Sequence, residues 1–182
     1  MGKVAFSNEH SSIEDVGEYY VDSAASLDSY FNFSTAIISF PARFVGYSRI
    51  DFDAELKNRK DTLDRMCSFE ILAAIEARFR VDYLTRCQEK KKDILSKKLR
   101  DIYKKSANKA KLVDDILTAW RDVFPEHKAC LDKLQKALDF RHWVAHGRYW
   151  QSKTSPHIYQ YDYLEVYILA VDLFSNLSLH DS

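Results

Sequence analysis

Glycine and proline are scarce in this chain, with four glycines and three prolines among 182 residues. Hairpin turns and flexible linkers draw heavily on both residue types, so their scarcity disfavours a sheet-rich or a disordered protein. The chain is 46% hydrophobic, which is enough for a self-sufficient core at this length. The composition therefore predicts an all-α protein that folds as a single helical bundle.

Cysteine is also rare, and Cys67, Cys87 and Cys130 lie far apart within helical patterns. An odd, widely spaced set of this kind is typical of core thiols. No basic-then-apolar leader opens the sequence and no apolar run reaches 18 residues, so we expect neither secretion nor membrane insertion. A reducing cytoplasm is the predicted location.

Neither sign of charge is in excess, because 27 Lys and Arg residues balance 27 Asp and Glu residues. Overall charge therefore gives no reason to expect a nucleic acid or an acidic membrane surface, and a local patch would have to bind such a partner. Residues 86–111 hold the strong local excess, with eleven basic and three acidic residues. We interpret this run as a solvated helix face, with a track for an RNA backbone as the alternative.

Hydrophobic periodicity and capping residues predict about five helices. Ser11 or Ser12 is available to cap a first helix from Ile13, whereas residues 41–51 lack periodicity and indicate a connection. Further helices are expected at about 53–60, 62–86, 108–123, 125–146 and 161–178. A charged and mostly exposed extension is expected to follow the helix at 62–86.

The expected domain organisation has two parts. Residues 51–182 are assigned to the bundle. Residues 1–50 are assigned to a partly helical segment whose position the pattern does not predict. We expect both parts to fold together as one compact domain. In the last helix the apolar spacing of Leu164, Ile168, Val171 and Phe174 or Ser175 predicts the buried face.

The most informative stretch is 138–150, where a helical pattern runs into two histidines, two arginines and a glycine. Leu131, Leu134, Leu138 and Ala145 share one helix face, and Arg141 lies on the edge of that apolar stripe. A guanidinium buried there without a partner would cost several kcal/mol, roughly, so it should contact a carboxylate, a carbonyl or a phosphate. If the partner is a carboxylate such as Glu76, Arg141 is purely structural and His146 is a helix cap favoured by the helix dipole.

Arg141 and His146 are five positions apart, which separates their side chains by about 140° on an unbroken helix. Gly147 suits the left-handed conformation that closes a helix. If the helix unwinds at His146, the imidazole can reach the same cavity as Arg141; alternatively, a second copy supplies the partner group across a two-fold axis. His142 and His146 also have the spacing of two zinc ligands, but no third ligand stands at a recognisable distance and His157 is merely near.

The run Arg141-His142-Trp143-Val144-Ala145-His146 resembles the Arg-x4-6-His signature of HEPN domains. Two longer runs, 69–83 and 141–150, look like the branch of that superfamily named after its RiboL-PSP association. The resemblance covers about residues 60–178, and His142 matches the polar residue that commonly follows the motif arginine. Residues before about 50 match nothing in the family.

The resemblance implies a helical bundle that forms a homodimer and cleaves single-stranded RNA without a metal or other cofactor, often as a toxin in prokaryotic antiviral defence beside an antitoxin. The chemistry is compatible, because an RNA 2′-OH is a built-in nucleophile and an imidazole exchanges protons near neutral pH. The implied catalytic residues are Arg141, His146 and His142. Arg148 and Tyr149 would bind the substrate backbone. The alternative is a non-catalytic module of the same fold that binds RNA or a protein.

Overall fold

The computed structural model describes residues 5–7, 9–32, 41–148 and 161–180. Within these ranges all regular secondary structure is helical, which confirms the predicted all-α class. The α-helices are α1 (Ile13–Tyr30), α2 (Arg49–Gln88), α3 (Ile94–Ser106), α4 (Thr118–Val123), α5 (Lys128–Ala145) and α6 (Tyr163–Asn176). Short helical turns occupy Ala42–Phe44, Ala107–Lys109, Leu112–Leu117 and Pro125–His127.

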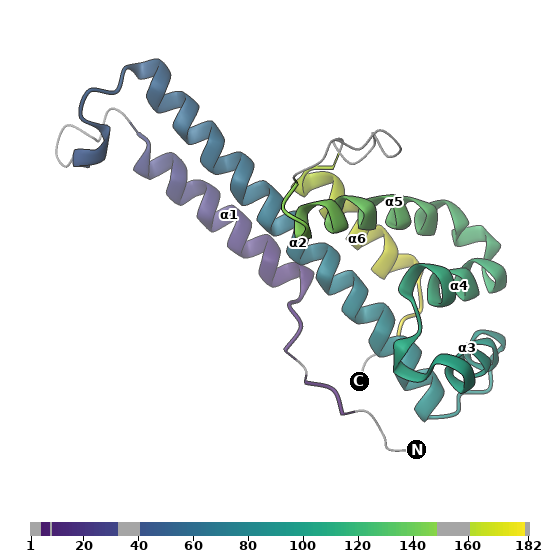
Figure 1. The fold of residues 1–182 in the computed structure, drawn as a ribbon. Helices are drawn as coiled ribbons and strands as arrows, with labels where there is room; N and C mark the ends of the chain where they lie inside the picture. Colours follow the sequence, from purple (N-terminus) through teal and green to yellow (C-terminus); the bar gives the residue numbers. More distant parts are fainter. Residues whose placement is uncertain (1–4, 8, 33–40, 149–160, 181–182) are drawn as a thin grey trace.

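Helix α2 is the axis of the fold (Figure 1). Helix α1 runs antiparallel beside its first half, α5 and α6 pack along its second half, and α3 and α4 lie at its far end. The main core lies where these helices meet, and its fully buried members include Ile71, Ile75, Leu134 and Leu173. The second half of α2 is thus covered on several sides, which explains its near-continuous burial.

The predicted break near residues 60–62 is wrong, because α2 is one helix of 40 residues. Its first half contains no Gly or Pro, and an exposed ladder of (i, i+4) ion pairs such as Lys57 to Asp61 supports it. Helix α1 also covers this half, so Leu63 is buried against the first helix. Helix α2 is longer than an ordinary surface helix, and it is stable because α1 packs alongside it.

The predicted charged extension after residue 86 forms a separate helix, and its lysines lie on the exposed face as expected. Helix α2 ends at Gln88, the chain turns at Lys90 with a φ of +53°, and α3 begins after its cap Asp93. Helix α3 buries Leu95 and Leu99 completely, and its lysines remain on the outer side. The basic run is therefore an amphipathic helix with its own place in the bundle.

The buried face of α6 differs from the predicted one. Leu164, Ile168 and Val171 are 60%, 56% and 42% exposed. The helix is instead buried through another set: Tyr163, Val166, Leu169, Ala170 and Leu173. Helix α6 is apolar around most of its circumference, so periodicity alone did not decide which face packs on α2 and α5.

The segment before residue 50 is attached to α2 at both ends of α1. Ser12 caps α1 by accepting a hydrogen bond from the Asp15 N–H at 3.0 Å, as expected, and Ile13 lies in the main core. At the other end Phe31, Phe44 and Phe52 form a small second cluster, with edge-to-face or tilted rings whose centroids are 5.0–5.3 Å apart. Aromatic packing thus closes the hairpin of α1 and α2.

The cysteines have the surroundings expected of core thiols. Cys67 and Cys87 are buried, and Cys130 is half-buried. Burial raises the pKa of the Cys87 thiol to about 11 and also raises the pKa of Cys67 and Cys130. None of these environments favours the thiolate that a nucleophilic cysteine needs.

Candidate functional site

Arg141 has the carboxylate partner that the sequence offered as one option. Its guanidinium Nη1 lies 3.0 Å from an oxygen of Glu76 on α2 and stacks over the ring of Phe69 at 5.4 Å. The other oxygen of Glu76 accepts a hydrogen bond from Arg80 at 2.8 Å. Arg141 therefore connects the last turns of α5 to α2, while its side chain remains 32% exposed.

Helix α5 ends where the glycine predicts. The N–H of Gly147 donates to the Val144 carbonyl at 3.0 Å, and the N–H of Arg148 donates to the Trp143 carbonyl at 3.1 Å. These two bonds form a Schellman motif, with Gly147 at a φ of +77°. The helix stays regular through Ala145, so His146 is the residue that caps it.

The two histidines lie together on the exposed end of α5. Their ring centroids are 4.2 Å apart, with the ring planes inclined by 56°. Both side chains are exposed, in contrast to Arg141. Because the helix unwinds only after His146, this imidazole stays beside His142 and does not swing round to Arg141. Within one copy of the chain, Arg141 therefore faces α2 and the imidazole pair lies on another face of α5.

A cleft of about 450 Å³ lies between α2 and the end of α5. Arg65 and Arg148 stand on its walls, and Met66, Phe69 and Val144 supply apolar surface. Arg65 donates to the Thr62 hydroxyl at 3.0 Å. Within the described ranges neither of the two cleft arginines has a carboxylate at ion-pair distance. Glu70 also lines the cleft, but its carboxylate accepts a hydrogen bond from Ser11 at 2.5 Å.

This arrangement suits a nucleotide better than a purely apolar ligand. Two guanidiniums can bind phosphate oxygens in their planar fork geometry, while the apolar surface can contact a base. Phe69 connects the cleft to Arg141, because its ring lines the cleft and lies under that guanidinium. Neither His142 nor His146 is among the lining residues, although Arg148 follows His146 by two positions.

The structure thus unites some of the predicted residues and separates others. Arg148 lies on the cleft, Arg141 stacks behind it and the histidines form their own pair. Tyr149, predicted to bind the substrate backbone, lies outside the described residues, as does His157. Arg65 was missed because it sits on α2, about 80 residues before the motif, and only the packing of α2 on α5 brings it near.

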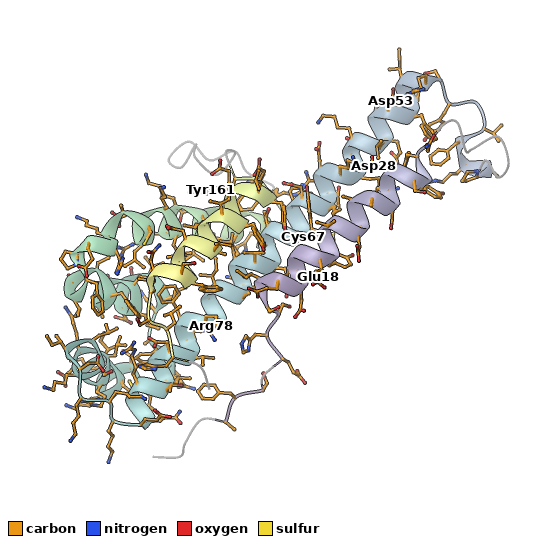
Figure 2. All side chains as sticks on the ribbon, turned by 180° about the vertical axis from the view of Figure 1, so that it is seen from behind. Glu18, Asp28, Asp53, Cys67, Arg78 and Tyr161 are labelled. Atoms are coloured by element: carbon orange, nitrogen blue, oxygen red, sulfur yellow. The ribbon has the colours of Figure 1, made fainter. Side chains whose placement is uncertain are left out.

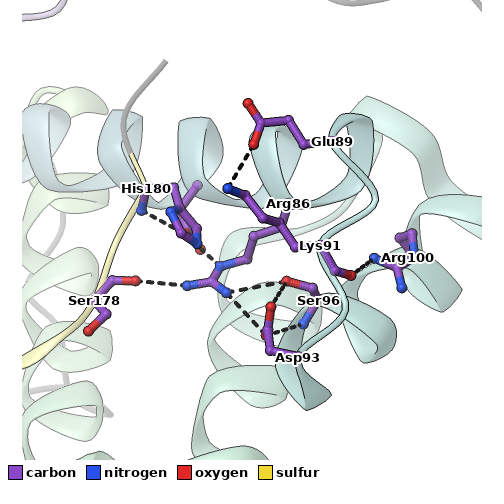
Figure 3. A network of polar contacts seen from close by, with 9 residues as sticks. Arg86, Glu89, Lys91, Asp93, Ser96, Arg100, Ser178 and His180 are labelled. Atoms are coloured by element: carbon purple, nitrogen blue, oxygen red, sulfur yellow. Dashed lines mark hydrogen bonds and ion pairs between the residues drawn. The ribbon is translucent and has the colours of Figure 1, made fainter.

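Arg86 is the centre of a buried polar network that the sequence pattern did not indicate (Figure 3). Its guanidinium lies 2.7 Å from Asp82 and 3.2 Å from Asp93, and it donates to the Ser178 carbonyl at 2.7 Å. The side chains of Arg86 and Asp82 are only 6% and 0% exposed. Arg86 belongs to the basic run of residues 86–111, but an Asp four residues earlier in an apolar context is the sequence signal of a buried pair.

The network connects α2 to the start of α3 and to the chain that follows α6. The N–H of His180 donates to Asp82 at 2.9 Å. Burial raises the pKa of the Asp82 carboxyl and outweighs the lowering by the His180 N–H and by Arg86. None of these residues lines the cleft, so the network is a structural element.

The sequence matches no family model, and neither a curated protein nor a solved structure matches the chain. The HEPN resemblance therefore depends on the motif residues themselves. Over the described ranges no three His, Cys, Asp or Glu side chains gather as a metal site would require. No helix in those ranges combines the length and the apolar character needed to cross a bilayer.

Proposed function

We propose that this protein is a metal-independent endoribonuclease that cleaves single-stranded RNA through its 2′-OH and leaves a 2′,3′-cyclic phosphate. The observation that carries the proposal is the exposed pair of imidazoles, 4.2 Å apart, at the helix end that also presents Arg148 to the cleft. The proposed setting is the cytoplasm of a prokaryote, where the enzyme acts in defence or as a toxin.

The reaction needs one group that accepts a proton and one that donates a proton. The base removes the 2′-OH proton, the 2′ oxygen forms a bond to phosphorus, and the bond from phosphorus to the 5′ oxygen breaks. The acid then protonates the leaving 5′ oxygen, so protons and bonds balance. His146 and His142 are the proposed base and acid, and two adjacent imidazoles can take either part.

The arginines hold the substrate in this proposal. Arg148 and Arg65 bind phosphates of an RNA strand that passes along the cleft and around the end of α5. Arg141 positions α5 on α2 through Glu76, and its partial exposure leaves it available to add positive charge behind Phe69. We also propose that the enzyme is a homodimer and that an antitoxin or regulatory protein keeps it inactive. These two parts of the proposal are based on the family resemblance alone.

A second candidate is a non-catalytic module that binds RNA or a protein through the same cleft. The specific observation in its favour is the ion pair of Arg141 with Glu76, because it engages the guanidinium that the family resemblance implies is catalytic. This alternative predicts RNA binding without any product at any pH.

The deciding experiment incubates the purified protein with a single-stranded RNA in EDTA and measures the product ends by mass spectrometry. We expect fragments with a 2′,3′-cyclic phosphate, and no cleavage of DNA of the same sequence because DNA lacks the 2′-OH. Activity lost in EDTA would instead favour zinc bound by His142 and His146. Binding without product from a folded dimer would favour the non-catalytic module.

The cleft makes a separate prediction about affinity. Arg65→Ala should weaken single-stranded RNA binding several-fold and reduce the slope of log K against log salt by about 0.7, the value for one lost phosphate contact. Arg59→Ala is the matched control, because Arg59 is exposed on the same helix but pairs with Glu55 at 2.9 Å. Fluorescence anisotropy at several salt concentrations measures both quantities. An Arg65 variant with the slope and affinity of wild type would remove Arg65 from the RNA path.

A further inference from the structure

A groove of about 670 Å³ lies between α1 and α6, and Glu18, labelled in Figure 2, lines it from α1. Gly17 allows the two helices to approach closely, since a Cβ at this position would lie 3.2 Å from the ring of Tyr167. Val21 from α1 and Leu164 from α6 line the groove. The groove is thus formed by side chains of both helices, with Gly17 among its lining residues.

An apolar stripe continues from the groove along α6. Val21 and Leu164 are 63% and 60% exposed, and Ile168 and Val171 follow Leu164 at helical spacing with 56% and 42% exposure. These are the residues whose periodicity predicts a buried face. A contiguous exposed apolar stripe of this kind, with a polar rim, marks an interaction surface.

The rim of the groove is acidic. Neither α1 nor α6 contains a lysine, arginine or histidine, and Glu14, Glu18 and Asp22 line the groove. The α1 carboxylate that does have a cation is Asp28, which pairs with Lys60 near the hairpin tip. In the part of the chain that the structure describes, no cation pairs with the three rim carboxylates.

We infer that this groove binds a protein partner through a basic amphipathic helix. The apolar face of such a helix would cover Val21, Leu164 and Ile168, and its lysines or arginines would pair with the acidic rim. A second copy of this chain is a poor occupant, because a two-fold contact through this face would bring two acidic rims together. The groove does not include the imidazole pair or the cleft of α2 and α5, so the inference stands independently of the proposed nuclease activity.

The test uses a fluorescent 14-residue peptide of leucine and lysine in an amphipathic helical pattern, with a leucine and glutamate peptide as its counterpart. We expect the lysine peptide to bind with an affinity that falls as salt rises, and the glutamate peptide not to bind. Glu18→Lys and Ile168→Asp should each weaken binding of the lysine peptide at least about tenfold. Fluorescence anisotropy measures the affinities, and circular dichroism checks that both variants are folded.

Matched controls change the same residue types elsewhere on the surface. Glu126→Lys lies just before α5, and Ile50→Asp lies at the hairpin tip, where Ile50 is 80% exposed. Both controls should bind the lysine peptide as wild type does. Equal affinity of all four variants would overturn the inference, because the peptide would then bind by general charge. A dimer in sedimentation that Ile168→Asp dissolves would also overturn it, because a second copy would then occupy the face.

Discussion

We expect His146→Ala to lower the rate of RNA cleavage by about 10²- to 10⁴-fold, the usual contribution of one acid–base group. His146 is exposed at the end of α5, and the hydrogen bonds that close this helix join backbone atoms around Gly147. The substitution therefore removes the imidazole and leaves the backbone hydrogen bonds that close the helix. Initial rates on a labelled single-stranded RNA in EDTA, with a thermal unfolding curve of each protein, measure the effect.

His10→Ala is the matched control, because His10 is exposed and precedes α1, outside the cleft and the histidine pair. It should cleave RNA at the wild-type rate. His142→Ala should cause a loss of similar size, and the double variant should lose little more, because the two imidazoles act as one unit. Wild-type activity of a folded His146 variant would end the assignment of this residue, and binding without cleavage by every form would favour the non-catalytic module.

Arg86→Met should lower the free energy of unfolding by about 3–5 kcal/mol, because it leaves the buried Asp82 carboxyl without its cation. The methionine can occupy much of the space of the arginine stem, so the loss reports mainly on the charge and on the hydrogen bonds to Ser178 and Asp93. Arg59→Met on the same helix removes an exposed (i, i+4) pair and should cost less than about 1 kcal/mol. Urea unfolding followed by circular dichroism measures both variants.

The pH dependence of this loss has a definite sign. Burial raises the pKa of the Asp82 carboxyl in the folded protein, so folding favours the neutral form of this group more than the unfolded chain does. Stability from such a group is present at low pH and is lost as pH rises through the folded pKa. The destabilisation by Arg86→Met should therefore shrink as pH is lowered toward the ordinary aspartate pKa of about 3.9. A loss that grows on acidification would show that Arg86 stabilises the fold by another route.

The sequence alone determined the features that depend on neighbouring residues. Scarce glycine and proline together with 3.6-residue periodicity determine the helical class. Ser12 caps α1 and Gly147 closes α5 where local chemistry predicts. The apolar surroundings of Arg141 also predicted a polar partner, and the Glu76 carboxylate, one of the options considered, is that partner. Each of these conclusions follows from contacts within about one helical turn, or from the requirement that a half-buried cation be paired.

Only the tertiary structure decided the features that depend on which helices meet. Periodicity marks apolar stripes on α6 without saying which of them packs, so Leu164 and Ile168 are exposed although their spacing predicts burial. The continuity of α2 depends on the cover that α1 provides, and the cleft depends on Arg65 and Arg148 being brought together from distant parts of the chain. The physical reason is that burial is a property of pairs of surfaces, and a sequence pattern describes one surface at a time.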